Sequence, residues 1–231
     1  MGIESTMKRS SFLFILLTAA IFLAGISSLI YEVLWIRQLG FALGSTAVAT
    51  SIMLTAFLGG LSVGSMIIGR FADHLENPIR VFILVEILAS IAGLASIPAL
   101  ASVGRAYVLI SSTIGLTGFW AMLARALFAL LIMAIPALLF GMTFPLATVI
   151  GTRFVGGQLA AGVVSAASSF GSAIGALLCG LWLEPTFGLF TSAQVAAFLN
   201  LVAAFLIAIT GVLIRSTRNH DSESVAWKMS V

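Results

Sequence analysis

Charged side chains are scarce in this sequence of 231 residues. It contains 11 Lys and Arg and 8 Asp and Glu, together 8% of the chain, whereas an ordinary soluble domain has about a quarter. Apolar residues make up 61%, more than a soluble core of this size can bury. The composition therefore excludes a soluble enzyme, a nucleic-acid-binding domain and a disordered chain, and it indicates an integral membrane protein.

Cysteine and histidine are also sparse, and this limits the chemistry that we expect. Cys179 is the one cysteine, which excludes an intramolecular disulfide and a cysteine-based metal site. The two histidines, His74 and His220, lie in different segments and lack the spacing of a metal site. We therefore expect no metal and no cofactor.

Long apolar runs predict an all-α, polytopic membrane protein with six transmembrane helices. A helix needs roughly 20 apolar residues to cross a bilayer. The predicted spans are residues 12–30, 45–69, 79–100, 119–149, 159–183 and 191–214. They form a membrane domain at residues 11–214, between a cytoplasmic N-terminus at residues 1–10 and a polar, mobile cytoplasmic tail at residues 215–231.

Two stretches depart from a simple span. Residues 101–118 are apolar but contain Arg105, and their uncharged run at 106–116 is too short to cross. We predict an outer loop there with a short interfacial helix, and a true crossing at this point would change the topology. In residues 119–149, Pro136 and Pro145 predict a kink, because proline removes a backbone donor.

The distribution of basic residues predicts the orientation. The proposed cytoplasmic side carries Lys8, Arg9, Arg70, Arg80, Arg153, Arg215, Arg218 and Lys228, whereas Arg37, Arg105 and Arg125 lie toward the other side. This excess follows the positive-inside rule. It predicts an even number of crossings in the inner (cytoplasmic) membrane, with both termini cytoplasmic.

Charged residues inside the apolar runs are the candidate substrate or ion pathway, because charge is costly in a membrane. They are Glu32, Arg37, Glu86, Arg125 and Glu184. All except Glu86 are expected at similar depth near the outer face, as an ion-paired gate or solute site, or as a structural clamp that reaches water. Glu86 lies about 10 Å from the cytoplasmic end of its helix, where it handles a cation or proton or is a buried, hydrogen-bonded acid.

Two glycine pairs predict close contacts between helices. Gly60 and Gly64, like Gly171 and Gly175, are spaced so that both members lie on one helix face. Helix packing is the simplest interpretation, and the same faces are also suited to sliding in a transporter.

Several motifs together resemble a known family. They are GISSLIYEVLWIR at residues 25–37, LGST at 43–46, AFLGGLSVGS at 56–65, GRFAD at 69–73, Glu86, the proline–glycine run at 136–145, and GSAIGA at 171–176 followed by Pro185 and Gly188. Their order resembles the membrane domain of bacterial spermidine-synthase-like membrane proteins, a major-facilitator/spermidine-synthase fusion family, over about residues 20–190. The resemblance implies a fold related to one six-helix half of a major facilitator transporter.

The resemblance also implies a helix-end clamp, in which an aspartate and basic residues hold neighbouring helices. The matching residues are Gly69, Arg70, Asp73 and Arg80, and the match is partial because His74 and Glu76 depart from the pattern. Family members usually carry a cytosolic aminopropyltransferase domain, whereas only 17 residues follow Ile214 here. We therefore expect no aminopropyltransferase activity unless a separate protein supplies that domain.

Three functions remain open on these grounds. The first is a facilitator-like half-transporter that works as a homodimer, and Glu86 and Glu32 favour a small, polyamine-like cation as its solute. The second is a non-catalytic module that anchors, or feeds substrate to, a separately encoded spermidine-synthase-like enzyme. The third is a structural subunit of a membrane complex that docks through the glycine faces. The lipid bilayer is the expected environment in each case, and no nucleic acid is expected.

Overall fold

The computed structural model describes residues 2–43, 46–114 and 118–229, and it places side chains at residues 10–41, 47–102, 120 and 122–215. The described residues form α-helices and no strand, which confirms the predicted all-α class. The helices are α1 (Gly2–Leu43), α2 (Thr46–Phe71), α3 (Pro78–Ile114), α4 (Gly118–Gly151), α5 (Gly157–Leu178) and α6 (Glu184–Met229). A 3-10 turn at Ala72–His74 follows α2, and a π-helical turn at Cys179–Leu183 joins α5 to α6.

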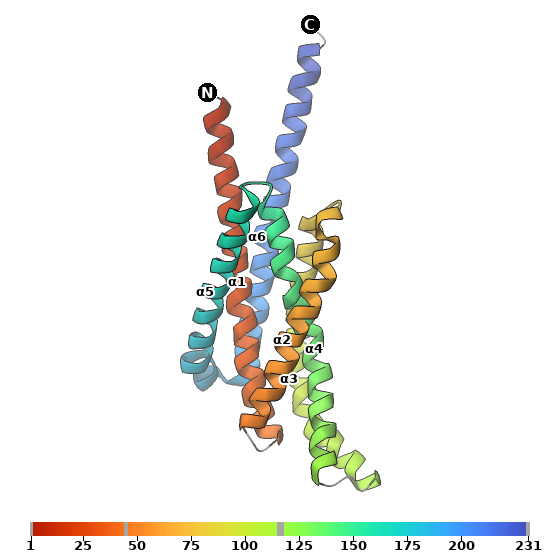
Figure 1. Cartoon of the computed structure of the whole chain (residues 1–231). Helices are drawn as coiled ribbons and strands as arrows, with labels where there is room; N and C mark the ends of the chain where they lie inside the picture. The colour runs from red at the N-terminus through yellow and green to blue at the C-terminus, as the bar shows by residue number, and fades with distance from the viewer. Residues whose placement is uncertain (1, 44–45, 115–117, 230–231) are drawn as a thin grey trace.

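Five segments of the described chain are long and apolar enough to cross a membrane, so the chain has the architecture of a multi-pass membrane protein. They are Ser10–Phe41, Ala47–His74, Pro78–Ser102, Met122–Gly151 and Gly157–Arg215. The last has 59 residues, which would measure about 88 Å as a straight helix. It contains Gly188 at φ 78 and ψ 175, a conformation that is essentially restricted to glycine. The chain reverses there, so that α5 and α6 run in opposite directions (Figure 1).

The contacts between helices divide the bundle into two related halves. Helix α1 packs on α5 and α6, α4 packs on α2 and α3, and α3 packs on α6. This pattern is unchanged when α1, α2 and α3 are exchanged for α4, α5 and α6. Helices α1 and α4 run in opposite directions (Figure 1), so the two halves have inverted topology.

Glycines allow the closest helix contacts. A Cβ atom at Gly60 or Gly64 of α2 would collide with Ala137 or Leu138 of α4. On the other side of the bundle, Gly171 and Gly175 of α5 lie directly against the α1 backbone. Both glycine pairs are thus placed in contacts within the chain, where a missing side chain lets two backbones approach. The parallel pairs α1–α5 and α2–α4 are the units that frame the site below.

Two sequence-based expectations differ from the structure, and a third is not settled by it. The outer loop predicted at residues 101–118 is wrong, because α3 continues without a break to Ile114 and α4 begins at Gly118; residues 115–117 lie outside the described chain. The tail expected to be mobile is helical, since α6 extends to Met229 in a stretch with no proline or glycine after Gly211. Helix α4 remains helical across Pro136 and Pro145, and the kink itself stays a prediction.

Candidate functional site

Buried polar side chains form a layer between two apolar clusters. One cluster lies toward the termini and includes Leu17, Phe82 and Leu146, and the other includes Tyr31 and Trp35. The side chains between them are Ser27 of α1, Glu86 and Ser90 of α3, Thr143 of α4 and Asn200 of α6, each at most 8% exposed. We call these five residues the polar layer. Because polar groups are expensive to bury in an apolar core, their gathering from four helices marks a candidate site.

Glu86 is the charged member of the polar layer and is fully buried. The Thr143 hydroxyl donates a hydrogen bond to Glu86 Oε1 at 3.2 Å. The other carboxylate oxygen, Oε2, has no hydrogen-bond partner among the residues whose side chains are placed. The carboxylate therefore has spare capacity to bind a proton, a water or a cation.

Asn200 lies at the level of Glu86. Ser90 Oγ donates to the Ala197 carbonyl at 3.0 Å, which fixes the register between the antiparallel helices α3 and α6. One turn toward the termini from this bond leads to Glu86 on α3 and to Asn200 on α6. Both amide atoms of Asn200 lack a hydrogen-bond partner in the described part of the chain, so unpaired acceptor and donor groups occupy the same depth.

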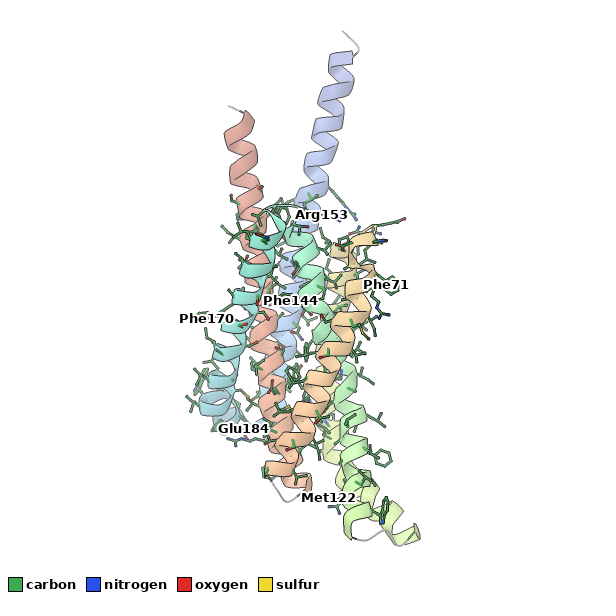
Figure 2. All side chains as sticks on the ribbon, viewed as in Figure 1. Phe71, Met122, Phe144, Arg153, Phe170 and Glu184 are labelled. Carbon is green, nitrogen blue, oxygen red and sulfur yellow. The ribbon has the colours of Figure 1, made fainter. Side chains whose placement is uncertain are left out.

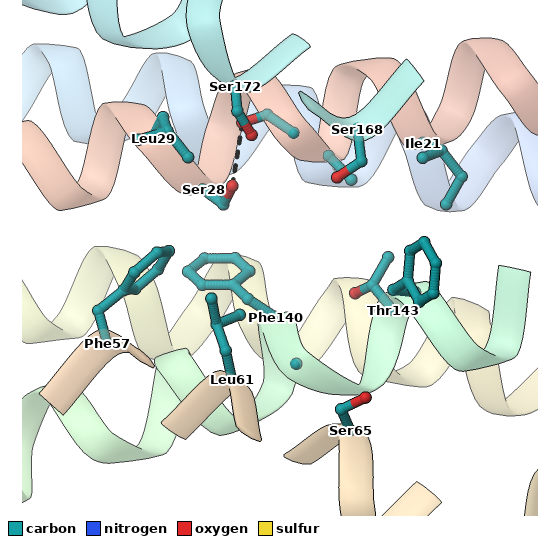
Figure 3. A pocket seen from close by; sticks show the side chains of 14 residues that line it. Ile21, Ser28, Leu29, Phe57, Leu61, Ser65, Phe140, Thr143, Ser168 and Ser172 are labelled. Carbon is teal, nitrogen blue, oxygen red and sulfur yellow. Dashed lines mark hydrogen bonds between the residues drawn. The ribbon is translucent and has the colours of Figure 1, made fainter. Parts of the chain in front are cut away.

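A cavity of about 280 Å³ lies beside the polar layer, between the α1–α5 and α2–α4 pairs (Figure 3). Its polar lining consists of the hydroxyls of Ser28, Ser65, Thr143, Ser168 and Ser172. Its aromatic lining consists of Phe57, Phe140 and Phe144. Ser28 and Ser172 both donate to the Gly25 carbonyl, at 3.0 and 3.3 Å, which leaves their oxygen lone pairs available as acceptors.

Thr143 belongs to both the cavity and the polar layer. It lines the cavity on one side and donates to Glu86 on the other. A solute that donates a hydrogen bond to the Thr143 oxygen would polarise this hydroxyl and change the strength of the hydrogen bond that it donates to Glu86. The arrangement can therefore couple occupation of the cavity to the charge state of Glu86.

The structure brings together two of the four charged residues expected near the outer face. Arg37 Nη1 and Glu184 Oε2 lie 2.5 Å apart, which ties the last part of α1 to the start of α6. Glu184 is labelled in Figure 2. Glu32 is half-buried on α1 and forms no ion pair in the described chain. Arg125 is half-buried near the start of α4. On α1, Arg37 lies ten positions beyond Ser27 of the polar layer, so the ion pair and Glu86 occupy separate places.

The residues predicted as a helix-end clamp are exposed at the end of the bundle that carries the termini. Gly69 and Arg70 lie in the last turn of α2, Asp73 lies in the 3-10 turn that follows, and Arg80 lies in the first turn of α3. Among the placed side chains, Arg70, Asp73 and Arg80 form no ion pair with one another.

Asn200, Thr143 and the serines of the cavity were not predicted as site residues from the sequence. Asn200 interrupts an apolar run, which is the signal that could have found it. The cavity hydroxyls gave no such signal, since Ser and Thr commonly satisfy themselves by bonding to a carbonyl one turn back. Within the described chain, no three His, Cys, Asp or Glu side chains gather as a metal site would require. Comparison with protein families, curated proteins and solved structures found no match for this chain.

Proposed function

We propose that this protein is a membrane carrier that binds a small cation in the cavity between the α1–α5 and α2–α4 pairs. The observation that carries the proposal is Thr143, whose hydroxyl lines the cavity and also binds the fully buried carboxylate of Glu86. In coupled transport, binding of the solute must alter the protonation or ion binding of a charged group inside the membrane. Buried acids are the usual groups with this role.

The chemistry of the cavity favours a cation. Its hydroxyl oxygens accept hydrogen bonds from an ammonium group, and the faces of Phe57 and Phe140 can attract a positive charge. The volume of about 280 Å³ is just below the usual range of ligand pockets, which begins at roughly 300 Å³. A short amine with few carbon atoms fits these limits, in line with the polyamine-like cation expected from the sequence.

The proposed topology has six crossings and two cytoplasmic termini. The reversal at Gly188 supports a division of the 59-residue segment into two crossings. The first and last helices also emerge at the same end of the bundle (Figure 1). Inverted three-helix repeats are common in secondary transporters, and they support the proposal that this chain is one half of a facilitator-like carrier, completed by a second copy.

Flux measurements with reconstituted protein test this function. Liposomes containing the full chain are expected to take up a labelled diamine. Thr143→Val keeps the shape of the side chain but removes a hydrogen bond to a charged group, and it is expected to lower the rate about tenfold or more. Thr148→Val is the matched control, because the Thr148 hydroxyl only bonds to the Phe144 carbonyl one turn back, at 3.0 Å. Equal rates for Thr143→Val and the wild type, or no flux of any amine, would contradict the proposal.

The docking role for the glycine faces has lost its support, because Gly60, Gly64, Gly171 and Gly175 are buried against helices of the same chain. A membrane module for a spermidine-synthase-like enzyme is the outcome to consider if no flux is found. Stable co-purification with a soluble aminopropyltransferase-like protein would then indicate that role.

A further inference from the structure

A second cavity lies at the end of the bundle from which both termini emerge. Its volume is about 380 Å³, and it is formed by the start of α3, the turn between α4 and α5, and the end of the apolar part of α6. Each segment contributes one arginine to the lining: Arg80, Arg153 and Arg215. Arg153 is labelled at this end of the bundle in Figure 2. We refer to this cavity as the arginine groove.

The arginine groove is strongly positive. Glu76 is its acidic lining residue, so one carboxylate faces three guanidinium groups. All three arginines are exposed, and none forms an ion pair within the part of the chain whose side chains are placed. Like charges that converge in this way repel one another, and a phosphate group would relieve the repulsion while accepting paired hydrogen bonds from guanidinium.

The groove also has an apolar wall. Ile79 and Ile83 line it from α3, and Ala208 and Val212 line it from α6. Arg215 follows Ala208 by seven positions, so the wall extends about 10 Å along the helix, away from the basic rim. A free phosphate ion makes no apolar contacts with such a wall, whereas the glycerol and acyl chains of a phospholipid can pack against it.

Gly211 keeps the groove open. A Cβ atom at this position would lie 3.0 Å from Ile79 Cγ2, on the opposite wall. A larger residue here would fill the groove and leave the three arginines in place. A substitution at Gly211 therefore tests the apolar contribution to ligand binding separately from the electrostatic contribution of the arginines.

We propose that the arginine groove binds an anionic phospholipid, with its phosphate at Arg80, Arg153 and Arg215 and its acyl chains along the apolar wall. Basic pockets between transmembrane helices are suited to such headgroups. The proposal needs only the multi-pass architecture, and it stands whether or not the chain is a carrier.

Native mass spectrometry of the full chain in detergent tests the proposal with defined lipids. Phosphatidylglycerol is expected to remain bound at concentrations at which phosphatidylcholine dissociates. Replacement of each groove arginine by glutamine is expected to lower the affinity for phosphatidylglycerol about fivefold. Arg70→Gln is the matched control, because Arg70 is exposed at the same end of the bundle but does not line the groove.

A second pair of variants distinguishes loss of lipid binding from loss of folding. Gly211→Leu is expected to weaken phosphatidylglycerol binding with all arginines present, whereas Gly69→Leu, at a site with no atom within 4 Å of the added Cβ, is expected to leave it unchanged. Equal retention of phosphatidylcholine would overturn the proposal, as would unaltered binding in the triple arginine variant. Displacement of the lipid by low millimolar inorganic phosphate would show a free-anion site and would also overturn it.

Discussion

At the scale of single residues, the polar layer is expensive to fold and is therefore informative. Glu86 and Asn200 are both fully buried, yet each has at least one atom without a hydrogen-bond partner among the described residues. A buried group left unsatisfied costs about 1–3 kcal/mol. By contrast, Ser27 and Ser90 are satisfied by carbonyls of α6, at 2.9 and 3.0 Å. Burial of the Glu86 carboxylate and the Asn200 amide therefore does not stabilise the fold. Local features that cost stability are expected at functional sites.

A substitution at Asn200 is expected to change stability and function in opposite directions. Asn200→Leu removes an unsatisfied amide and keeps nearly the same shape, so we expect the detergent-solubilised protein to be about 1 kcal/mol more stable. The same variant is expected to lower amine flux in liposomes, since the polar layer loses the unpaired amide that lies at the depth of Glu86. Thermal unfolding and flux are measured on the same preparation.

Ser90→Ala is the control for this prediction. It breaks a satisfied hydrogen bond between α3 and α6, and we expect a loss of about 1 kcal/mol. If Asn200→Leu destabilises the protein by as much as Ser90→Ala, the Asn200 amide has a structural partner and does not mark a functional position.

At the scale of helices, the two parallel pairs are held by backbone contact at glycine. Gly64→Ala would drive a methyl group into the Leu138 carbonyl of α4, and overpacking of this kind costs about 1–3 kcal/mol. Gly59→Ala on the same helix is the matched control, because no atom lies within 4 Å of the added Cβ. Thermal unfolding in detergent is expected to show a lower midpoint for Gly64→Ala alone. Equal midpoints would mean that α2 and α4 do not pack through this face.

The helices were largely predictable from the sequence, and their arrangement was not. Apolar runs located each helix core, because burial in lipid requires a minimum length without charge. The continuation of α3 through Arg105 was missed, since one charged residue near the end of a helix can reach water. Glu86 was predicted from its charge. That it lies at the same depth as Asn200 depends on the register between α3 and α6. Nothing within either helix alone specifies that register.

At the scale of the whole molecule, the cavity lies where the two inverted halves meet, because α1 and α2 line it from one half and α4 and α5 from the other. Helices α1 and α4 occupy equivalent positions, and each contributes to both the cavity and the polar layer through Ser27 and Ser28 on α1 and Thr143 on α4. The close pairs α1–α5 and α2–α4 are likewise equivalent. The site is thus at the junction of the halves, where a relative movement of one half would alter access to it.

The number of crossings decides whether this symmetry is real in the membrane. Six crossings place Thr186, which precedes the reversal at Gly188, on the face opposite to His74 in the turn after α2. Five crossings would leave Thr186 inside the last span. We expect Thr186→Cys, in a Cys179→Ala background, to react with a membrane-impermeant maleimide added outside intact cells, and His74→Cys to react only after lysis. Cys179 is buried, so its removal serves to lower the background. Protection of Thr186→Cys both before and after lysis would contradict the reversal and, with it, the inverted repeat on which the carrier proposal depends.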